Sequence, residues 1–129
     1  MARPDNSRSA VLDATAIVAI LFGEPGSERV LPLLQNAVVS AVNLAEVHIH
    51  LLRRGVKADL AWKGLQDLGV EVFPFDAEQA RLAGEIEEPA LPLGDRACLA
   101  LAILRKATVY TTDQAWKDLD LGIEVVVVR

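Results

Sequence analysis

Short runs of almost wholly apolar residues recur along the chain and alternate with segments of helical periodicity. We predict strands at residues 10–12, 37–41, 70–73, 108–111 and 124–128. Strands that are apolar throughout are typical of a parallel sheet, because helices cover both of its faces. The alternation of strands with helices favours right-handed βαβ crossovers. The pattern therefore predicts an α/β fold, a three-layer α/β/α sandwich with a central five-stranded parallel sheet.

Helices are predicted between these strands, with ends marked by glycine and proline. The helical pattern of residues 14–22 stops at the turn cluster Gly23-Glu24-Pro25-Gly26, and that of residues 43–54 stops at Gly55. The segment 85–94 contains two prolines and is expected to be a loop. Further helices are expected around residues 61–68, after Asp76, at 97–104 and at 116–119.

The length and polarity of the chain favour one domain without a membrane anchor. Its 129 residues suit a single domain, 1–129, in which the polar residues 1–8 are expected to form a flexible N-terminal extension. The single cysteine, Cys98, cannot form an intrachain disulfide and is expected to lie in the core. Because no apolar run is long enough to span a bilayer, we expect no membrane association and a cytoplasmic location.

Four acidic residues stand beside the predicted strands, where a site could form. Ligands of open parallel sheets bind beyond the carboxyl ends of the strands. Asp13 ends the first strand, Glu46 follows the second, and Asp113 follows the fourth. Asp95 opens the helix that leads into the fourth strand, which would place it at the opposite edge unless that helix starts near the site. The residues alone leave both placements of Asp95 open.

Carboxylates gathered in one pocket would repel one another, and their pKa values would rise unless a cation neutralised them. Oxygen ligands with room for water suit Mg²⁺ or Mn²⁺. One or two such ions can activate water and clamp a phosphodiester, so no His, Cys or Ser nucleophile is needed.

Helix capping is the competing interpretation of these acids. Asp13, Asp95 and Asp113 each precede a helical pattern, and Asp is a favoured N-cap residue. Asn43 and Glu46 have the spacing of a capping box. Both interpretations can hold at once, since a helix N-terminus also stabilises an ionised carboxylate.

At these residues the sequence resembles a PIN-domain ribonuclease, in particular a VapC-type toxin of a toxin–antitoxin pair. Four motifs occur in order over nearly the whole chain, which makes the resemblance fairly specific. The matching stretches are Val11-Leu12-Asp13-Ala14-Thr15-Ala16, Ser40-Ala41-Val42-Asn43-Leu44-Ala45-Glu46-Val47, Leu93-Gly94-Asp95-Arg96-Ala97-Cys98-Leu99-Ala100-Leu101-Ala102 and Thr111-Thr112-Asp113.

The resemblance implies a PIN-like fold with a five-stranded parallel sheet and an endoribonuclease that depends on Mg²⁺ or Mn²⁺. It implies that the catalytic, metal-binding residues are Asp13, Glu46, Asp95 and Asp113, and that Asp95 comes round to the pocket. It also implies an RNA substrate, a homodimer, and a cognate VapB-type antitoxin that blocks the site.

The same resemblance implies further residues near the metal site, and the sequence differs from the family pattern at two places. Thr15 and Thr111 match hydroxyl positions that often lie near the metal site, and Asn43 is expected beside them because it follows the second strand. The loop before Asp95 looks a few residues shorter than usual. Gln114 stands where relatives often carry a basic residue, so one possible phosphate contact is missing.

The net charge of −5 does not favour nucleic-acid binding, which normally uses Lys and Arg. Local basic residues are therefore the candidates for RNA contacts, namely Arg53, Arg54 and Arg96. For Arg53 and Arg54, a solvated helix end is the competing interpretation. His48 and His50 are two residues apart, so they point to different sides of a helix and are not expected to bind a metal together.

Three other classes of protein are alternatives to this interpretation. A receiver-type signalling domain needs paired acids early in the chain and a lysine after the last strand, but Asp13 has no acidic neighbour and no lysine follows Val125. A phosphatase of the haloacid-dehalogenase type needs a second acid two residues after Asp13, where Thr15 stands. A catalytically inactive PIN-like domain that binds only a protein partner stays open, although the complete set of acids disfavours it.

Overall fold

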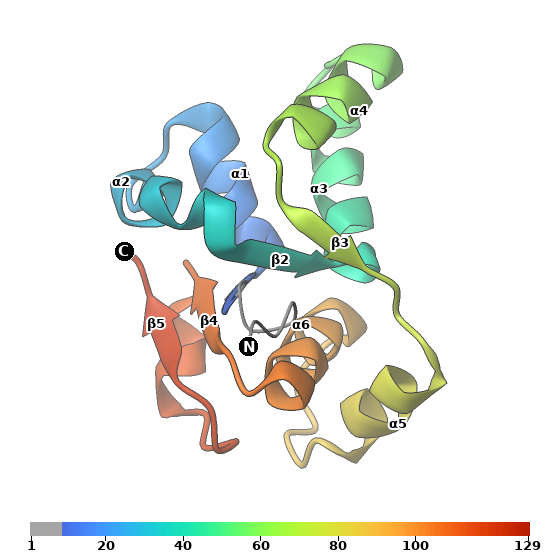
Figure 1. The fold of residues 1–129 in the computed structure, drawn as a ribbon, viewed down its shortest axis with the longest axis vertical. Helices are drawn as coiled ribbons and strands as arrows, with labels where there is room; N and C mark the ends of the chain where they lie inside the picture. The colour runs from blue at the N-terminus through green and yellow to red at the C-terminus, as the bar shows by residue number, and fades with distance from the viewer. Residues whose placement is uncertain (1–8) are drawn as a thin grey trace, which may run out of the picture.

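The computed structural model describes residues 9–129, so the predicted N-terminal extension, 1–8, lies outside the described residues. The strands form one sheet in which all neighbours are parallel, in the order β3-β2-β1-β4-β5 (Figure 1). The predicted five-stranded parallel sheet is confirmed. The strands are β1 (Ala10–Leu12), β2 (Ala37–Ser40), β3 (Glu71–Phe73), β4 (Thr108–Thr111) and β5 (Val125–Val127).

Helices connect these strands, and several of their boundaries differ from the prediction by a few residues. Helix α3 begins two residues early, because the Ser40 hydroxyl caps it by accepting a hydrogen bond from the Val42 amide at 3.2 Å. Helix α6 begins at Leu93, inside the predicted loop. Residues 27–36, for which the pattern predicts no element, form α2 and η2. The helices are α1 (Ala14–Phe22), α2 (Ser27–Val30), η2 (Leu31–Asn36), α3 (Ala41–Arg53), α4 (Ala58–Asp67), α5 (Ala77–Glu85), α6 (Leu93–Arg105) and η3 (Gln114–Asp118).

The helices of the described part of the chain are short. The longest, α3 and α6, have 13 residues each. Within residues 9–129, no helix is both long and apolar enough to cross a bilayer.

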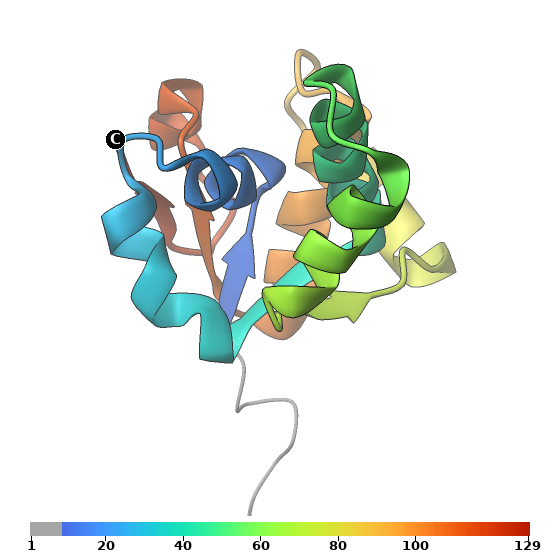
Figure 2. The same ribbon diagram turned by 90° about the horizontal axis from the view of Figure 1, so that it is seen from above.

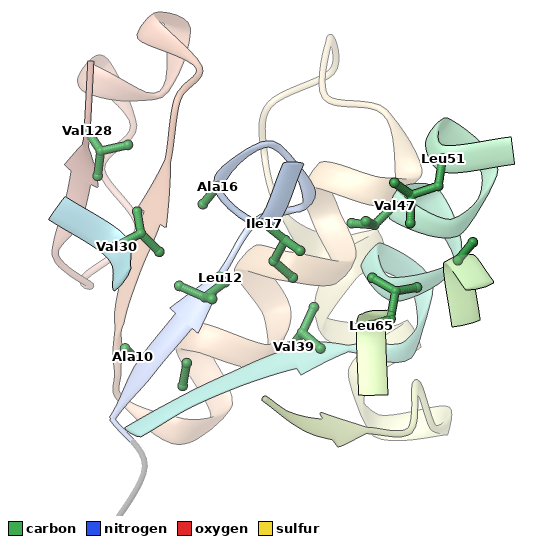
Figure 3. Packing of buried hydrophobic residues seen from close by; sticks show 12 residues of the cluster. Ala10, Leu12, Ala16, Ile17, Val30, Val39, Val47, Leu51, Leu65 and Val128 are labelled. Carbon is green, nitrogen blue, oxygen red and sulfur yellow. The ribbon is translucent and has the colours of Figure 1, made fainter. Parts of the chain in front are cut away.

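The two faces of the sheet bury separate hydrophobic clusters. Leu12 packs in one cluster with Ile17 of α1 (Figure 3), and its neighbour Val11 packs in the other with Leu99 of α6. Successive strand residues alternate between the clusters because side chains along a strand point to opposite faces. In Figure 1, α1, α3 and α4 lie above the strands and α5 and α6 below them. The predicted three-layer arrangement and the buried position of Cys98 are thus confirmed.

The C-terminal end of the chain lies beside the turn that leads into α2 (Figure 2). Gly26 in this turn has a φ of 99°, and a Cβ at this position would lie 2.8 Å from the carbonyl oxygen of Val128. Any side chain at this position would therefore meet both backbone strain and a steric collision. Glycine allows the end of the chain to close against this turn, near the carboxyl edge of the sheet.

Candidate metal-binding site

The four predicted metal-binding acids line one cavity of about 450 Å³ at the carboxyl edge of the sheet. Asp13 follows β1, Glu46 lies in the second turn of α3, and Asp113 follows β4. Because the strands are parallel, the residues after β1, β2 and β4 emerge at the same edge. The structure therefore brings the four side chains together, whereas their role as ligands stays a prediction.

Asp95 reaches this cavity because of the direction in which α6 runs. The helix precedes β4 and crosses back over the sheet, so it starts at the carboxyl edge and ends where β4 begins. The opposite placement, left open by the sequence, is wrong. The N-cap of α6 is Pro92, which places Asp95 in the first turn, so the capping interpretation of Asp95 is also wrong.

Asp13 is almost completely buried, with 3% of its surface exposed. Its Oδ2 atom accepts two hydrogen bonds of 2.8 Å, from the hydroxyls of Thr15 and Thr111. Burial raises the pKa of the Asp13 carboxyl, and the bonds from Thr111 and Thr15 oppose that rise. Its backbone occupies the N-cap position of α1, but its side chain makes no capping hydrogen bond. The carboxylate is thus held by the two threonines that the resemblance placed near the site.

The same two hydroxyls connect Asp13 to the backbone that follows β4. The Thr15 hydroxyl accepts a hydrogen bond from the Thr112 amide, and the Thr111 hydroxyl accepts one from the Asp113 amide, both at 3.0 Å. Each threonine therefore accepts from the main chain and donates to Asp13. This arrangement fixes the position of Asp13 relative to Asp113.

The pKa of Asp95 reflects both its burial and the presence of other acids in the cavity. Burial is the largest cause that raises its pKa to about 6, the negative charge of Asp13 is the next, and the charges of Asp113 and Glu46 contribute less. The indole N–H of Trp116 donates to Asp95 Oδ2 at 3.3 Å and opposes the rise. The cavity therefore disfavours full ionisation of its carboxyls when no cation is nearby.

Asn43 and Glu46 contact each other within α3 but do not form a capping box. Asn43 is fully buried, and its Nδ2 donates at 2.9 Å both to Glu46 Oε1 and to the carbonyl oxygen of Gly94. The capping-box prediction is wrong because Ser40, three residues before Asn43, is the N-cap. Asn43 instead joins Glu46 to the first turn of α6.

Asp113 is the acid for which the capping interpretation is confirmed. Its side chain is exposed, and Oδ1 accepts a hydrogen bond of 2.9 Å from the Ala115 amide at the start of η3. The cap holds the carboxylate at the end of β4, beside the cavity.

The donor set of the cavity fits a hard divalent cation. All four acids offer oxygen, which suits Mg²⁺ or Mn²⁺. The raised pKa values of Asp13 and Asp95 show that negative charge is unfavourable here, and a cation would relieve it. Within residues 9–129, no group of three or more His, Cys, Asp or Glu side chains is arranged to hold a metal ion without side-chain movement. Glu46 and Asp113 are both exposed, but Glu46 is held by Asn43, so Asp113 is the acid with more room to move towards an ion.

Comparison with known proteins assigns the family. The model of the PIN domain matches residues 10–121. The chain belongs to the PIN-domain family. A VapC ribonuclease of Mycobacterium bovis and ribonuclease VapC42 of Mycobacterium tuberculosis are each 35% identical to it over 106 residues, with 71% of this chain and 81% of the relative covered. The resemblance inferred from the four motifs is thereby confirmed.

Solved structures of PIN-domain toxins share the fold. VapC20 of Mycobacterium tuberculosis, a toxin that cleaves the sarcin–ricin loop, superposes with a TM-score of 0.70 at 17% identity, covering 90% of this chain and 99% of that one. DNA-bound VapBC of Salmonella typhimurium superposes with a TM-score of 0.72 at 17% identity, covering 92% and 96%. At such low identity these likenesses establish the fold alone.

The predicted RNA-contacting arginines of this PIN domain have different surroundings. The Arg96 guanidinium donates to the carbonyl oxygens of four residues that precede it, at 2.8 to 3.1 Å. These bonds hold together the segment before α6, and Arg96 is not among the residues that line the cavity. Arg54 stacks 4.2 Å above the ring of Phe22. Arg53 is exposed at the last turn of α3.

Three polar or charged residues that line the cavity were not predicted as site residues, namely Glu24, His50 and Arg129. His50 lies one helical turn after Glu46, so the spacing of four residues could have placed both on one face. Arg129 follows the fifth strand, at the same edge as the acids, and lies 3.5 Å from Glu24. His48 contacts Trp62 edge-to-face instead, so the two histidines do point apart as predicted.

Proposed function

We propose that this PIN-domain protein is a metal-dependent endoribonuclease that acts as the toxin of a VapBC-type toxin–antitoxin pair. The observation that carries the proposal is the cavity at the carboxyl edge, which is lined by four carboxylates from four separate segments of the chain. The curated relatives at 35% identity are named as VapC ribonucleases, which supports the choice of RNA phosphodiesters as the substrate.

The cofactor in this proposal is Mg²⁺ or Mn²⁺, held by Asp13, Asp95 and Asp113. Glu46 is either a further ligand or the group that orients the attacking water. With such an ion bound, the site would gain a positive charge beside the scissile phosphate and a water of lowered pKa. Among the described residues that line this cavity there is no serine or cysteine, and the Thr15 hydroxyl is already bonded to Asp13 and to the Thr112 amide, so hydrolysis by water is the reaction class favoured here.

Each acid has a distinct task in this mechanism. Asp13 is the fixed ligand, since burial and two threonine donors leave it little freedom. Trp116 orients Asp95 through its indole N–H. Glu46 would act from the α3 side of the cavity, where Asn43 donates a hydrogen bond to its carboxylate.

RNA would be held beside the cavity by a few scattered cations. Arg129 lines the cavity, and Arg53 and Arg54 lie at the end of α3 beyond His50. With a net charge of −5, the chain is expected to bind RNA with modest affinity that falls as salt rises.

The proposed partners are a cognate VapB-type antitoxin, which would cover the acidic cavity, and a second copy of the chain in a homodimer. Toxin–antitoxin complexes and DNA-bound VapBC complexes among the structural neighbours support the antitoxin proposal. We propose a cytoplasmic location because RNA and an antitoxin meet the protein there. Co-expression with the neighbouring small open reading frame should yield a stable complex, and its absence would argue against the antitoxin.

The enzymatic proposal is tested by incubating purified, antitoxin-free protein with a panel of labelled tRNA and ribosomal RNA fragments. Cleavage is expected with Mn²⁺ or Mg²⁺ and should stop when EDTA is added. No cleavage by well-folded protein at any metal concentration would favour the catalytically inactive PIN-like domain that binds only a protein partner.

A further inference from the structure

The carboxylate of Glu46 lies directly against the backbone of Gly94 in the first turn of α6. A Cβ built on Gly94 would lie 2.5 Å from Glu46 Cδ and 2.7 Å from Oε1, and closer still to Oε2. Non-bonded carbon and oxygen atoms do not approach so closely. The position of the Glu46 carboxylate is therefore compatible with glycine at residue 94 and not with a larger residue.

A buried amide holds the same carboxylate from a second side. Asn43 Nδ2 donates at 2.9 Å to Glu46 Oε1 and at 2.9 Å to the Gly94 carbonyl oxygen. The bond from Asn43 to the Gly94 carbonyl is buried and so shielded from bulk water, whereas the bond to Glu46 is partly buried. One side chain of α3 thus ties another side chain of α3 to the backbone of α6.

Glu46 would otherwise be a poorly fixed residue. Its side chain is exposed on α3, and a glutamate on a helix surface samples several rotamers. A carboxylate that orients water must be held close to one geometry, because a displacement of about 1 Å can cost about a hundredfold in rate. The contacts with Gly94 and Asn43 supply that restraint.

We propose that Gly94 and Asn43 are positioning residues that fix the Glu46 carboxylate at the cavity. The proposal rests on the proposed ribonuclease function for its effect on rate, but the contact itself is a property of the fold. The first turn of α6 therefore contributes Asp95 to the cavity and also contacts the Glu46 carboxylate through Gly94.

The test is Gly94→Ala, with Gly84→Ala as the matched control. Both glycines lie in helices, but a Cβ at Gly84 meets nothing within 4 Å. In Gly94→Ala the methyl group should displace the flexible end of Glu46, so kcat should fall at least about tenfold with KM little changed. Gly84→Ala should keep the wild-type kcat. Equal kcat values for the two variants would overturn the proposal.

A double-mutant cycle separates this inference from the ribonuclease proposal, because it needs no activity. The melting temperature is measured for Gly94→Ala, Glu46→Ala and the double variant. Gly94→Ala should be less favourable to the melting temperature in the wild type than in the Glu46→Ala protein, where the collision is absent and only the gain in helix propensity remains. If Gly94→Ala does not fold, Glu46→Ala should restore folding. Equal effects of Gly94→Ala in both backgrounds, or no restoration, would contradict the contact even in a protein that cleaves no RNA.

Discussion

The acids of the cavity differ in how firmly each is held. Asp13 is buried and fixed by two hydroxyls, whereas Asp113 is exposed and capped through one oxygen. A rigid carboxylate costs little reorganisation on metal binding, and an exposed one can adapt to the ion or the substrate. We therefore expect the affinity for metal to depend most strongly on the network around Asp13.

Replacing Thr111 by valine should test this network. The variant loses the hydroxyl that donates to Asp13 and accepts from the Asp113 amide, while its side chain keeps nearly the same shape. We expect Mn²⁺ affinity and cleavage to fall by about tenfold to a hundredfold, the range typical of lost hydrogen bonds to metal ligands. Calorimetric titration with Mn²⁺ measures the first effect.

The matched control for that variant is Thr108→Val on the same strand. The Thr108 hydroxyl donates to Glu124 at an exposed position, at the opposite end of β4. It should therefore bind Mn²⁺ like the wild type. A loss of affinity as large as that of Thr111→Val would show that any threonine change in β4 is damaging and would remove the support for the network.

Residue types predicted the acids but not their contacts. The Asp95 side chain looked like a helix cap, and only the start of α6 at Leu93 shows that it is not. Arg96 looked like an RNA contact from its place in the sequence, yet its guanidinium is occupied by four backbone carbonyls. Such contacts depend on the path of a loop, which carries no periodic signal in the sequence.

At the scale of elements, strand positions were predictable because buried parallel strands are continuous apolar runs. The first residues of the helices were less predictable, since several residues near a boundary can act as caps. For α3, both Ser40 and Asn43 are good N-cap residues. Ser40 is the N-cap in the structure, and Asn43 donates to Glu46 and to the Gly94 carbonyl of α6. The shift of two residues changes Asn43 from a cap into a link between two helices.

Gly26 provides a prediction at this scale, because it joins the turn before α2 to the end of the chain after β5. Alanine there would collide with the Val128 carbonyl in addition to adopting a φ of 99°. We expect Gly26→Ala to lower the free energy of unfolding by more than the roughly 1–2 kcal/mol that left-handed strain costs. Urea denaturation measures the loss.

Gly55→Ala is the control, since Gly55 has a φ of 90° but a Cβ there meets nothing within 4 Å. It should show the strain without the collision. If both variants lost the same stability, the contact between this turn and the end of the chain would contribute nothing.

At the scale of the whole molecule, the layered fold and the positions of Asp13, Glu46 and Asp113 at one edge follow from the sequence pattern, whereas the position of Asp95 depends on the path of α6. The acids come from segments that are far apart in the chain, and the chain as a whole is only moderately acidic. Net charge therefore says little about this site. The pKa values of Asp13 and Asp95 are raised mainly by burial, and the charges of the neighbouring acids add to the rise.

These pKa values predict how the metal-free protein responds to pH. Because the folded-state pKa of Asp95, about 6, exceeds the ordinary value of 3.8, the folded protein retains protons that the unfolded chain releases. Ionisation of Asp95 and Asp13 thus opposes folding, and this effect grows as pH rises through about 6. We expect the melting temperature in EDTA to fall between pH 5 and pH 7.5, by an amount that calorimetry can measure.

Mg²⁺ or Mn²⁺ should weaken this dependence, because a bound cation favours the ionised carboxylates. Asp95→Asn should weaken it as well, since the substitution removes one of the two titrating groups. A pH profile that is identical in the wild type and in Asp95→Asn would show that this carboxyl does not carry the effect.

The central claim is that the four carboxylates form one metal site on which RNA cleavage depends. Calorimetric titration with Mn²⁺ of wild-type protein, Asp95→Asn and Asp76→Asn tests it most directly. Asp76 caps α5 through the Gln79 amide, away from the cavity, and asparagine caps equally well. The account predicts that the wild type and Asp76→Asn bind Mn²⁺ alike and that Asp95→Asn loses binding. Equal binding by all three folded proteins would contradict it.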